Sequence, residues 1–410
     1  MYKQSVRILD VWVLIFGQTD GIICKQGVRR ELCGVALDLE VNTIMKTAIL
    51  TFQDALNYGA VLQAYALQHT LEKTFSPDEV GVLNYHCPII RQKHAPTYVS
   101  KKGNPVKGFL KMLRYYPLKK RRKEVFDAFK ARYLNLISYD TPEEKKRFSQ
   151  AFDAIVVGSD QVWNTDLTDN DAAYFLSDFS SMKRFSYAAS IGKREINAQE
   201  AERYKALASL DRISVREASA KQILSTIIPN DVYTVPDPVL LLDQAEWRTV
   251  AKPYGDLKPG SYVLLYQFNT GASLVNFAKQ KAAERGCKVV SIQNVDKQIP
   301  GAQVICDASP DEFVWLFDNA ACVVTNSFHG TMFSVIFEKE FYSETKMNRS
   351  TRIVELLQKY QMNDSVLENG KPTGGTRDRE LSRQLVAQDR QRGFDFIALM
   401  KDAEAQRTAL

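Results

Sequence analysis

The chain has 410 residues, 45% of them hydrophobic and 25% charged, with a formal net charge of +6. This composition is that of an ordinary soluble globular protein with enough chain for two domains. The small positive charge does not indicate nucleic acid as a partner, and no apolar run approaches the roughly 18 residues that cross a bilayer.

The cysteines contain no evident metal-binding or redox pair. There are six, none in a close C-x-x-C arrangement, and three lie in or beside apolar runs, namely Cys87, Cys306 and Cys322. We interpret these as buried thiols, which predicts a reducing and therefore cytoplasmic location.

The first 44 residues differ from the rest. Residues 11–16 are apolar and follow basic residues, as in a secretory signal, but Asp10 interrupts the segment and no clean cleavage site follows. Met45, in contrast, directly precedes a predicted core strand. We therefore expect residues 1–44 to be an extension outside the fold, so that a chain truncated to begin at Met45 still folds.

Strands and helices alternate from Met45 to about residue 250, which predicts a parallel sheet of the doubly wound type. The expected strands are residues 48–52, 80–85, 152–157, 184–189 and 212–215. The expected helices are residues 59–73, 200–210 and 217–225. We assign residues 45–250 to an N-terminal α/β domain on the acceptor side of the site described below.

Prolines, glycines and charges concentrate at residues 251–260, and the alternation then restarts. The expected strands are residues 262–268, 288–293 and 322–325, and the expected helices are residues 272–285, residues 311–317 and a segment after His329. Residues 260–365 would form a second α/β domain, and residues 379–403 a helical tail crossing back over the first. The predicted fold class is α/β, with two Rossmann-like doubly wound domains facing a cleft.

Residues 323–334 are the most informative segment. A buried strand leads into a polar turn containing His329 and Gly330, and apolar residues at helical spacing follow. A helix beginning there directs free N–H groups and its positive dipole end at a ligand, which favours an anion. Histidine exchanges protons near neutral pH, so the turn predicts transfer chemistry on a phosphorylated or carboxylated substrate. The alternative is a histidine that bonds only to backbone.

Residues 158–164 follow another predicted strand, at the end where open α/β sheets bind ligands. Asp160 and Trp163 suit a sugar, because the carboxylate accepts from hydroxyl groups while the indole stacks on the ring. The alternative is a helix-capping Asp160 with Trp163 in the core. Asn57, after the first strand, is likewise either a helix cap or a ligand contact.

Other polar residues carry weaker signals. Arg216 ends a predicted strand and would either clamp a carboxylate or phosphate or pair on the surface. His69, His86 and His94 are interpreted as structural or exposed, and no ligand pair at metal-binding spacing accompanies them. We therefore predict no metal site.

Residues 119–123 contain only Lys and Arg, near the apolar side chains of Phe109, Leu113 and Tyr116. Such a run is usually a solvated helix face. The other interpretation is a basic rim that makes a peripheral contact with the inner face of a membrane and attracts a phosphorylated glycolipid.

Six motifs in the same order make the chain resemble the polysaccharide pyruvyl transferase family from about Met45 to Lys359. They are residues 57–67 (NYGAVLQAYAL), 158–164 (GSDQVWN), 187–192 (YAASIG), 214–217 (SVRE), 236–240 (PDPVL) and 327–330 (SFHG). No single motif is decisive, but the series is specific.

The resemblance implies a GT-B-like fold and a transferase that moves a pyruvyl group from phosphoenolpyruvate to a sugar of a cell-surface or extracellular glycan. The product would be a pyruvate ketal across two hydroxyls. Phosphoenolpyruvate would be a co-substrate, and the acceptor would be a glycan or a lipid-linked sugar. The resemblance implies neither a cofactor nor a metal.

The matched motifs suggest roles for individual residues. His329 would be the general acid or would hold the phosphate, and Asp160 would be the base. Donor binding is expected from Arg216, Ser327, Gly330 and Arg352, and acceptor binding from Asn57, Gln161, Trp163 and Asn164. Family members often carry an arginine shortly before the histidine, where this chain has Asn326-Ser327-Phe328. We therefore expect the missing positive charge to come from Arg349 or Arg352.

Two other functions stay open. A nucleotide-sugar glycosyltransferase could share the fold, but it should carry an acidic residue at a strand end of the second domain, and the pattern places neither Glu338 nor Glu344 there. A non-catalytic glycan-binding relative would bind anions without turnover.

Overall fold

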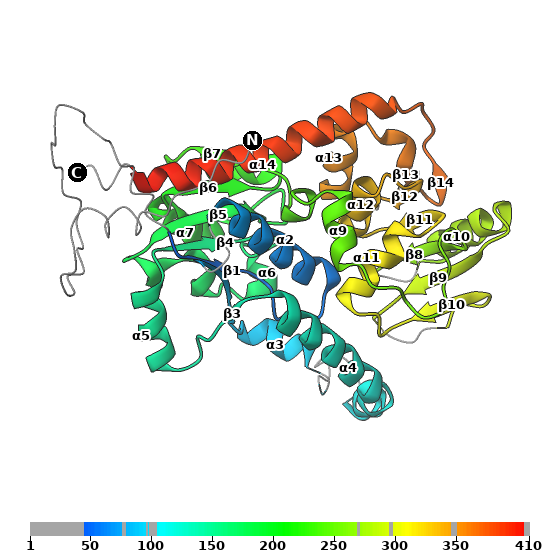
Figure 1. Ribbon diagram of the computed structural model, residues 1–410, viewed down its shortest axis with the longest axis horizontal. Helices are drawn as coiled ribbons and strands as arrows, with labels where there is room; N and C mark the ends of the chain where they lie inside the picture. Colours follow the sequence, from blue (N-terminus) through cyan, green and yellow to red (C-terminus); the bar gives the residue numbers. More distant parts are fainter. Residues whose placement is uncertain are drawn as a thin grey trace, which may run out of the picture. The chain divides into compact units, whose positions relative to one another are not determined.

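The computed structural model describes residues 45–75, 79–95, 97, 105–268, 271–294, 298–345 and 351–405. The predicted N-terminal extension, residues 1–44, and Arg349 lie outside the described residues. Two seven-stranded sheets, each flanked by helices, make up the described chain (Figure 1). They confirm the predicted α/β class with two Rossmann-like units.

The first sheet has the order β3-β2-β1-β4-β5-β6-β7, and all its strands are parallel. The strands are β1 (Thr47–Leu50), β2 (Val80–Leu83), β3 (Leu136–Ile137), β4 (Ala154–Val157), β5 (Lys183–Ala189), β6 (Arg212–Val215) and β7 (Val232–Thr234). The central strands β1 and β4 are buried along their whole length, because helices cover both faces of a parallel sheet.

The helices of this part are α2 (Tyr58–Thr74), α3 (Pro88–His94), α4 (Pro105–Tyr133), α5 (Pro142–Ala151), α6 (Thr165–Thr168), α7 (Ala198–Tyr204), α8 (Ala218–Ser225) and α9 (Gln244–Val250). Helix α2 begins where Asn57 caps it: the Asn57 side chain accepts hydrogen bonds from the backbone N–H groups of Gly59 and Ala60.

The second sheet has the order β10-β9-β8-β11-β12-β13-β14, parallel except for the final β13–β14 pair. Its strands are β8 (Tyr262–Tyr266), β9 (Lys288–Ile292), β10 (Ala302–Ile305), β11 (Cys322–Thr325), β12 (Phe341–Glu344), β13 (Val366–Glu368) and β14 (Lys371–Pro372). The helices are α10 (Ala272–Glu284), α11 (Pro310–Asp318), α12 (Phe328–Ile336), α13 (Thr351–Lys359) and α14 (Arg379–Ala405).

Each sheet has a point where the winding reverses, between β1 and β4 in the first and between β8 and β11 in the second. Ligands of open α/β sheets bind beyond the carboxyl ends of the strands at such a point. The loop after β4 leads to Asp160, and the turn after β11 leads to His329. The topology therefore places two of the predicted motifs at reversal points.

One hydrophobic cluster runs through both α/β parts. Tyr58 of α2 stacks on Phe313 of α11 with ring centroids 4.4 Å apart, and Trp247 of α9 meets Phe333 of α12 at 5.0 Å. Because these contacts are apolar and extensive, the two parts are packed against each other and do not merely share a linker.

Two long helices add to this packing. Helix α14 lies across both parts (Figure 1): its Phe396 contacts Tyr233 of β7, and its Asp389 accepts a hydrogen bond from Tyr360. Helix α4 carries the basic run at residues 119–123, and there the buried Arg122 donates hydrogen bonds to carbonyl oxygens of Leu56, Gln293 and Cys306.

The three cysteines expected to be buried, Cys87, Cys306 and Cys322, are free and buried. Burial raises the pKa of the Cys322 thiol to about 12, with Glu340 adding to the shift. A thiol in such a setting is a small core side chain and not a nucleophile.

Candidate active site

His329 is positioned by the turn between β11 and α12. The Ser327 hydroxyl caps α12 by accepting from the Gly330 backbone N–H at 3.2 Å, and the Ser327 N–H donates to the Thr325 hydroxyl at 3.0 Å. A side chain at Gly330 would bring its Cβ to 2.5 Å from the Thr325 hydroxyl, so only glycine fits. Ser327 and Gly330, predicted to bind the donor, thus shape the turn, while His329 occupies the first turn of the helix.

The imidazole of His329 lies against the first turn of α2. A Cβ on Gly59 would lie 2.0 Å from Nδ1 of the ring, far inside any allowed contact. The beginnings of α2 and α12 therefore converge on the same histidine. Each contributes the partial positive charge of a helix N-terminus, an arrangement that favours anions.

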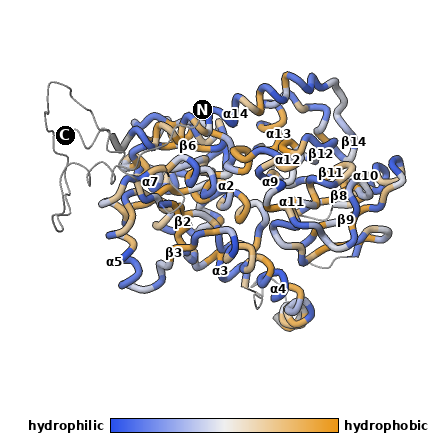
Figure 2. The backbone as a smooth tube through the Cα atoms, in the orientation of Figure 1, coloured by the Kyte–Doolittle hydropathy of each residue, from blue (hydrophilic) through white to orange (hydrophobic). Residues whose placement is uncertain are grey.

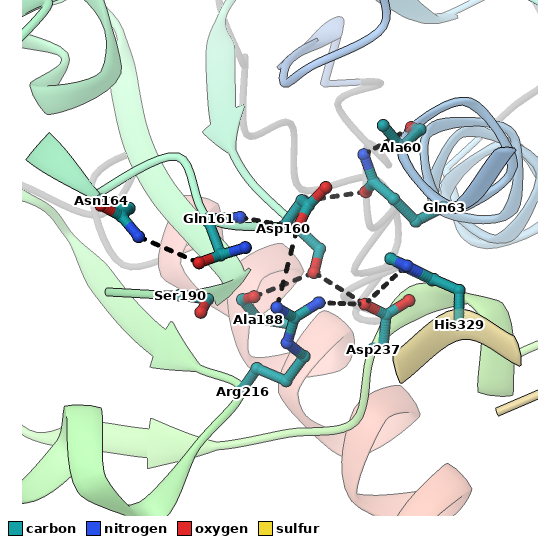
Figure 3. Close-up of polar contacts among 12 residues, drawn as sticks. Ala60, Gln63, Asp160, Gln161, Asn164, Ala188, Ser190, Arg216, Asp237 and His329 are labelled. Carbon is teal, nitrogen blue, oxygen red and sulfur yellow. Dashed lines mark hydrogen bonds and ion pairs between the residues drawn. The ribbon is translucent and has the colours of Figure 1, made fainter. Parts of the chain in front are cut away.

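Asp237 faces His329 from the other side (Figure 3). Its Oδ2 lies 3.5 Å from His329 Nε2, and Oδ2 also accepts a hydrogen bond from Arg216 Nη1 at 2.6 Å. Burial alone would raise the pKa of Asp237, but the charges of His329 and Arg216 outweigh it and hold that pKa well below its usual range. Asp237 is therefore an anion across the physiological range.

Arg216 sits at the centre of an acidic cluster. Its side chain is 3% exposed and contacts three carboxylates: Nε bonds Glu217 at 3.2 Å, Nη1 bonds Asp237, and Nη2 lies 3.7 Å from Asp160. Burial opposes the charge, but these three carboxylates raise the pKa of Arg216 above its usual value. Only Nη2, which is buried without a hydrogen bond in the described residues, is left for a ligand.

Arg352 is the second cation of the site. Arg216 and Arg352 both lie over the ring of Phe328, with guanidinium carbons 4.5 Å and 5.6 Å from its centroid. Arg352 is partly exposed and makes no hydrogen bond or ion pair with any described residue. Burial, and then the charge of Arg216, lower its pKa from the usual value. A bound anion would relieve both effects, so this arginine is the better anion ligand of the two.

Asp160, Gln161 and Asn164 line the loop after β4. Asp160 has a left-handed backbone (φ 66°), and its Oδ1 accepts from the Gln161 N–H at 2.9 Å. Gln161 Oε1 accepts from Asn164 Nδ2 at 3.0 Å, a contact that crowds Gly192, where a Cβ would lie 2.1 Å from Oε1. Figure 3 shows this loop on one side of Arg216 and His329 on the other.

Three residues predicted to contact the acceptor make structural contacts. Trp163 is 0% exposed, and its indole N–H donates to the Tyr174 carbonyl at 2.9 Å, so no face of the ring is open to a sugar. Trp163 is therefore a core residue, as the alternative interpretation predicted, and it does not stack on a sugar. Asn57 uses its side chain to cap α2, while Asn164 caps α6 as well as bonding Gln161.

The sequence prediction missed four members of the cluster. Asp237 and Glu217 hold Arg216; Ser159 donates to Asp237 at 3.4 Å, and Ser190 donates to Glu217 at 2.7 Å. All four lie just beyond strands of the first sheet, in motifs already noted. Their positions at strand ends could have indicated a role in the site, but the sequence does not show which side chains they contact.

The site is largely closed. His329, Arg216 and Asp160 each expose 7–8% of their surface. A cavity of about 690 Å³ lies elsewhere, beneath α14, and includes Arg248, Lys339 and Arg383 in its lining. Among the described residues, no group of three or more His, Cys, Asp or Glu side chains is arranged to hold a metal ion.

UDP-N-acetylglucosamine 2-epimerases are among the similar solved structures. The enzyme from Rickettsia bellii is 12% identical over 88% of this chain and 95% of its own, with a TM-score of 0.42. The enzyme from Neisseria meningitidis bound to UDP-GlcNAc is 11% identical over 87% and 93%, with a TM-score of 0.45.

Another similar structure is the ADP-heptose heptosyltransferase II from E. coli, 12% identical over 84% of this chain and 99% of its own, with a TM-score of 0.35. No curated protein sequence matches the chain significantly. The family model of the polysaccharide pyruvyl transferases, in contrast, matches residues 57–343 and so takes in every site residue described above except Arg352. The chain belongs to the polysaccharide pyruvyl transferase family.

Proposed function

We propose that this protein transfers a pyruvyl group from phosphoenolpyruvate to a sugar, forming a ketal on two hydroxyls of a glycan precursor. The observation that carries the proposal is the place of His329, held between the beginning of α2 and the Asp237 carboxylate with Arg352 close by. A proton donor beside a cation that has no carboxylate partner among the described residues suits a substrate that is both anionic and activated by protonation.

The donor requires two anion sites, one for its phosphate and one for its carboxylate. Arg352 has no carboxylate partner among the described residues and can form two parallel hydrogen bonds with either group. The free N–H groups at the beginning of α12 suit the other group. Arg216 contributes mainly its long-range charge, since three carboxylates already surround it.

The reaction needs one proton given and one taken. His329 Nε2, buried without a hydrogen bond in the described chain, would protonate the methylene carbon of phosphoenolpyruvate. Positive charge then develops at the neighbouring carbon, where a sugar hydroxyl attacks and loses its proton to Asp160. The second hydroxyl then displaces the phosphate and closes the ring, its proton leaving with the phosphate, and the products are the ketal and inorganic phosphate.

Asp237 makes this acid effective without touching substrate. The Asp237 carboxylate lies 3.5 Å from His329 Nε2 and orients the imidazole. Arg216 and the Ser159 hydroxyl hold that carboxylate in place. Asp237 is therefore a positioning residue, and its loss should alter the pH profile of turnover as well as its rate.

The test is phosphate release from phosphoenolpyruvate with a panel of sugar acceptors. We expect release to require an acceptor and to fall by about 10²–10⁴-fold in His329→Gln, the usual contribution of a general acid. His69→Gln is the matched control, because His69 lies on α2 but stacks on Tyr65 away from the site. Release that persists in His329→Gln would exclude the assigned role.

One observation favours a second candidate, a nucleotide-sugar glycosyltransferase. Contrary to our expectation, Glu344 does end a strand of the second sheet: it is the last residue of β12, buried, and accepts from the Ser273 hydroxyl at 2.5 Å. Glu338, in contrast, pairs with Arg383 at the surface. Thermal stabilisation by a nucleotide sugar that disappears in Glu344→Gln, without phosphate release from phosphoenolpyruvate, would establish this alternative.

A further inference from the structure

The N-terminal half of α4 exposes a row of large apolar side chains. Val106, Phe109, Leu110, Leu113 and Tyr116 are 65%, 52%, 59%, 52% and 39% exposed. Their spacing of three and four residues places them on one face of the helix. The other exposed large hydrophobic residues of the described chain occur singly, so this row needs an explanation that they do not.

The two halves of α4 have different surroundings. Beyond Pro117, an internal residue of the helix, the side chains of Arg122, Phe126 and Phe129 are buried against the body of the protein. Before it, the helix projects from the lower edge of the described chain, and hydrophobic residues colour its projecting end (Figure 1, Figure 2). The exposed row therefore belongs to a segment that the fold does not use for its own core.

Positive charge surrounds the same segment. Between residues 105 and 123 the sequence contains eight Lys or Arg residues and no Asp or Glu. Of these, Arg121 pairs with Asp307 and Lys123 with Asp127, while Lys120, which is largely exposed, pairs with Glu124 at 3.9 Å among the described residues. A helix with an apolar face flanked by basic residues is the form that binds the surface of an anionic membrane.

The charge also decides against a second copy of this chain as the occupant. In a symmetric dimer the same face meets itself, so the two basic segments would be brought together and would repel each other. An anionic lipid surface has the complementary charge and accepts apolar side chains at its boundary. No helix in the described residues is both long and apolar enough to cross a bilayer, so the contact would be with the surface.

We infer that the N-terminal half of α4 docks on the surface of an anionic phospholipid membrane, with Phe109, Leu110 and Leu113 inserted among the headgroups. This contact extends the basic-rim interpretation from residues 119–123 to an apolar anchor some turns earlier. Within the run itself, Arg122 serves the packing of the two α/β parts and is not available to lipid.

The same helix connects this surface to the candidate active site. Arg122 donates to the hydroxyl of Tyr58, the first residue of α2, and the neighbouring Gly59 contacts His329. Nine residues separate Leu113 from Arg122, about 14 Å along a helix. If the proposed function holds, docking would bring the site near the membrane, where a lipid-linked sugar would present its headgroup.

Flotation with vesicles tests the inference independently of catalysis. The full chain is mixed with vesicles of phosphatidylcholine, alone or with phosphatidylglycerol. We expect binding to the anionic vesicles that weakens as salt rises. The double substitution Leu110→Glu and Leu113→Glu should reduce partitioning at least about a hundredfold, because each buried leucine contributes a factor of about ten or more.

Leu399→Glu is the matched control, because Leu399 is an exposed apolar residue of α14; it should float like the unaltered protein. Both variants should retain the unaltered melting temperature and phosphate release with a soluble acceptor, which separates this inference from the proposed function. Absence of binding to anionic vesicles would overturn it. Vesicle binding that survives the double substitution would also overturn it. So would a protein that does not bind vesicles but self-associates, if the double substitution removes that self-association.

Discussion

Replacing Gly59 with alanine should lower activity about a hundredfold while leaving the fold intact. The new Cβ would lie 2.0 Å from His329 Nδ1, whereas ordinary contacts begin at 3.4 Å. The imidazole must therefore move by about 1.4 Å, the difference of these distances, or rotate out of the site. A displacement of about 1 Å in a catalytic group costs about 10²-fold in rate, which corresponds to about 2.7 kcal/mol in the activation free energy.

The effect on stability should be small, because two contributions oppose each other. Alanine is favoured over glycine within a helix by about 1 kcal/mol, and overpacking costs about 1–3 kcal/mol. The assays are phosphate release with an acceptor and thermal unfolding, with Gly108→Ala in α4 as a helical substitution outside the site. A Gly59→Ala protein with normal turnover would refute the placement of His329 as the acid. A protein that no longer folds would show that the contact supports the fold instead.

Three further substitutions probe the charges of the site and of the domain packing. Asp237→Asn should lower the free energy of unfolding by about 3–5 kcal/mol, since it breaks a buried ion pair. Because the folded pKa of Asp237 is depressed, the carboxylate stabilises the fold above its unfolded pKa of about 3.9, and this contribution is lost as the pH falls below that value. The stability of the variant should therefore decline less steeply than that of the unaltered protein when both are titrated with acid. Arg352→Met keeps a side chain over Phe328 and should weaken phosphoenolpyruvate binding at least about tenfold in calorimetry with little change in melting temperature; unchanged affinity would move the anion site elsewhere. Arg122→Met should lower the free energy of unfolding in denaturant by about 3 kcal/mol, because three backbone carbonyls lose a charged donor. Lys120→Ala, at an exposed position of the same run, should change it by no more than about 0.5 kcal/mol. Equal effects of the two substitutions would contradict the role given to Arg122.

The alternation of strands and helices could be predicted because buried parallel strands appear as short apolar runs. The edge strands β3 and β14 were not predicted, because each has only two residues, too few for a periodic hydrophobic pattern. The turn at His329 was equally predictable, since the strand, the Ser327 cap and the glycine all lie within a few residues of one another. What depends on local sequence was therefore visible in advance.

Partners distant in sequence explain what was missed. Asp237 reads as the cap of a proline-containing turn, and it does accept from the Val239 N–H. Its bond to Arg216 joins the ends of two different strands, and its contact with His329 joins the two sheets. No local sequence pattern predicts either contact. Trp163 was misread for the same reason: whether an indole faces a ligand or the core depends on residues distant in sequence, and here the ring is fully buried with its N–H bonded to the Tyr174 carbonyl.

The beginning of α2 connects these observations, because three consecutive residues there have three separate roles. Asn57 caps the helix, Tyr58 stacks on Phe313 and receives Arg122, and Gly59 leaves room for His329. The packing of the two α/β parts and the place of the proposed acid thus depend on the same helical turn. Any shift of one part against the other must move Gly59 relative to His329, so a change that loosens the Tyr58–Phe313 contact should affect turnover even though neither ring touches the site.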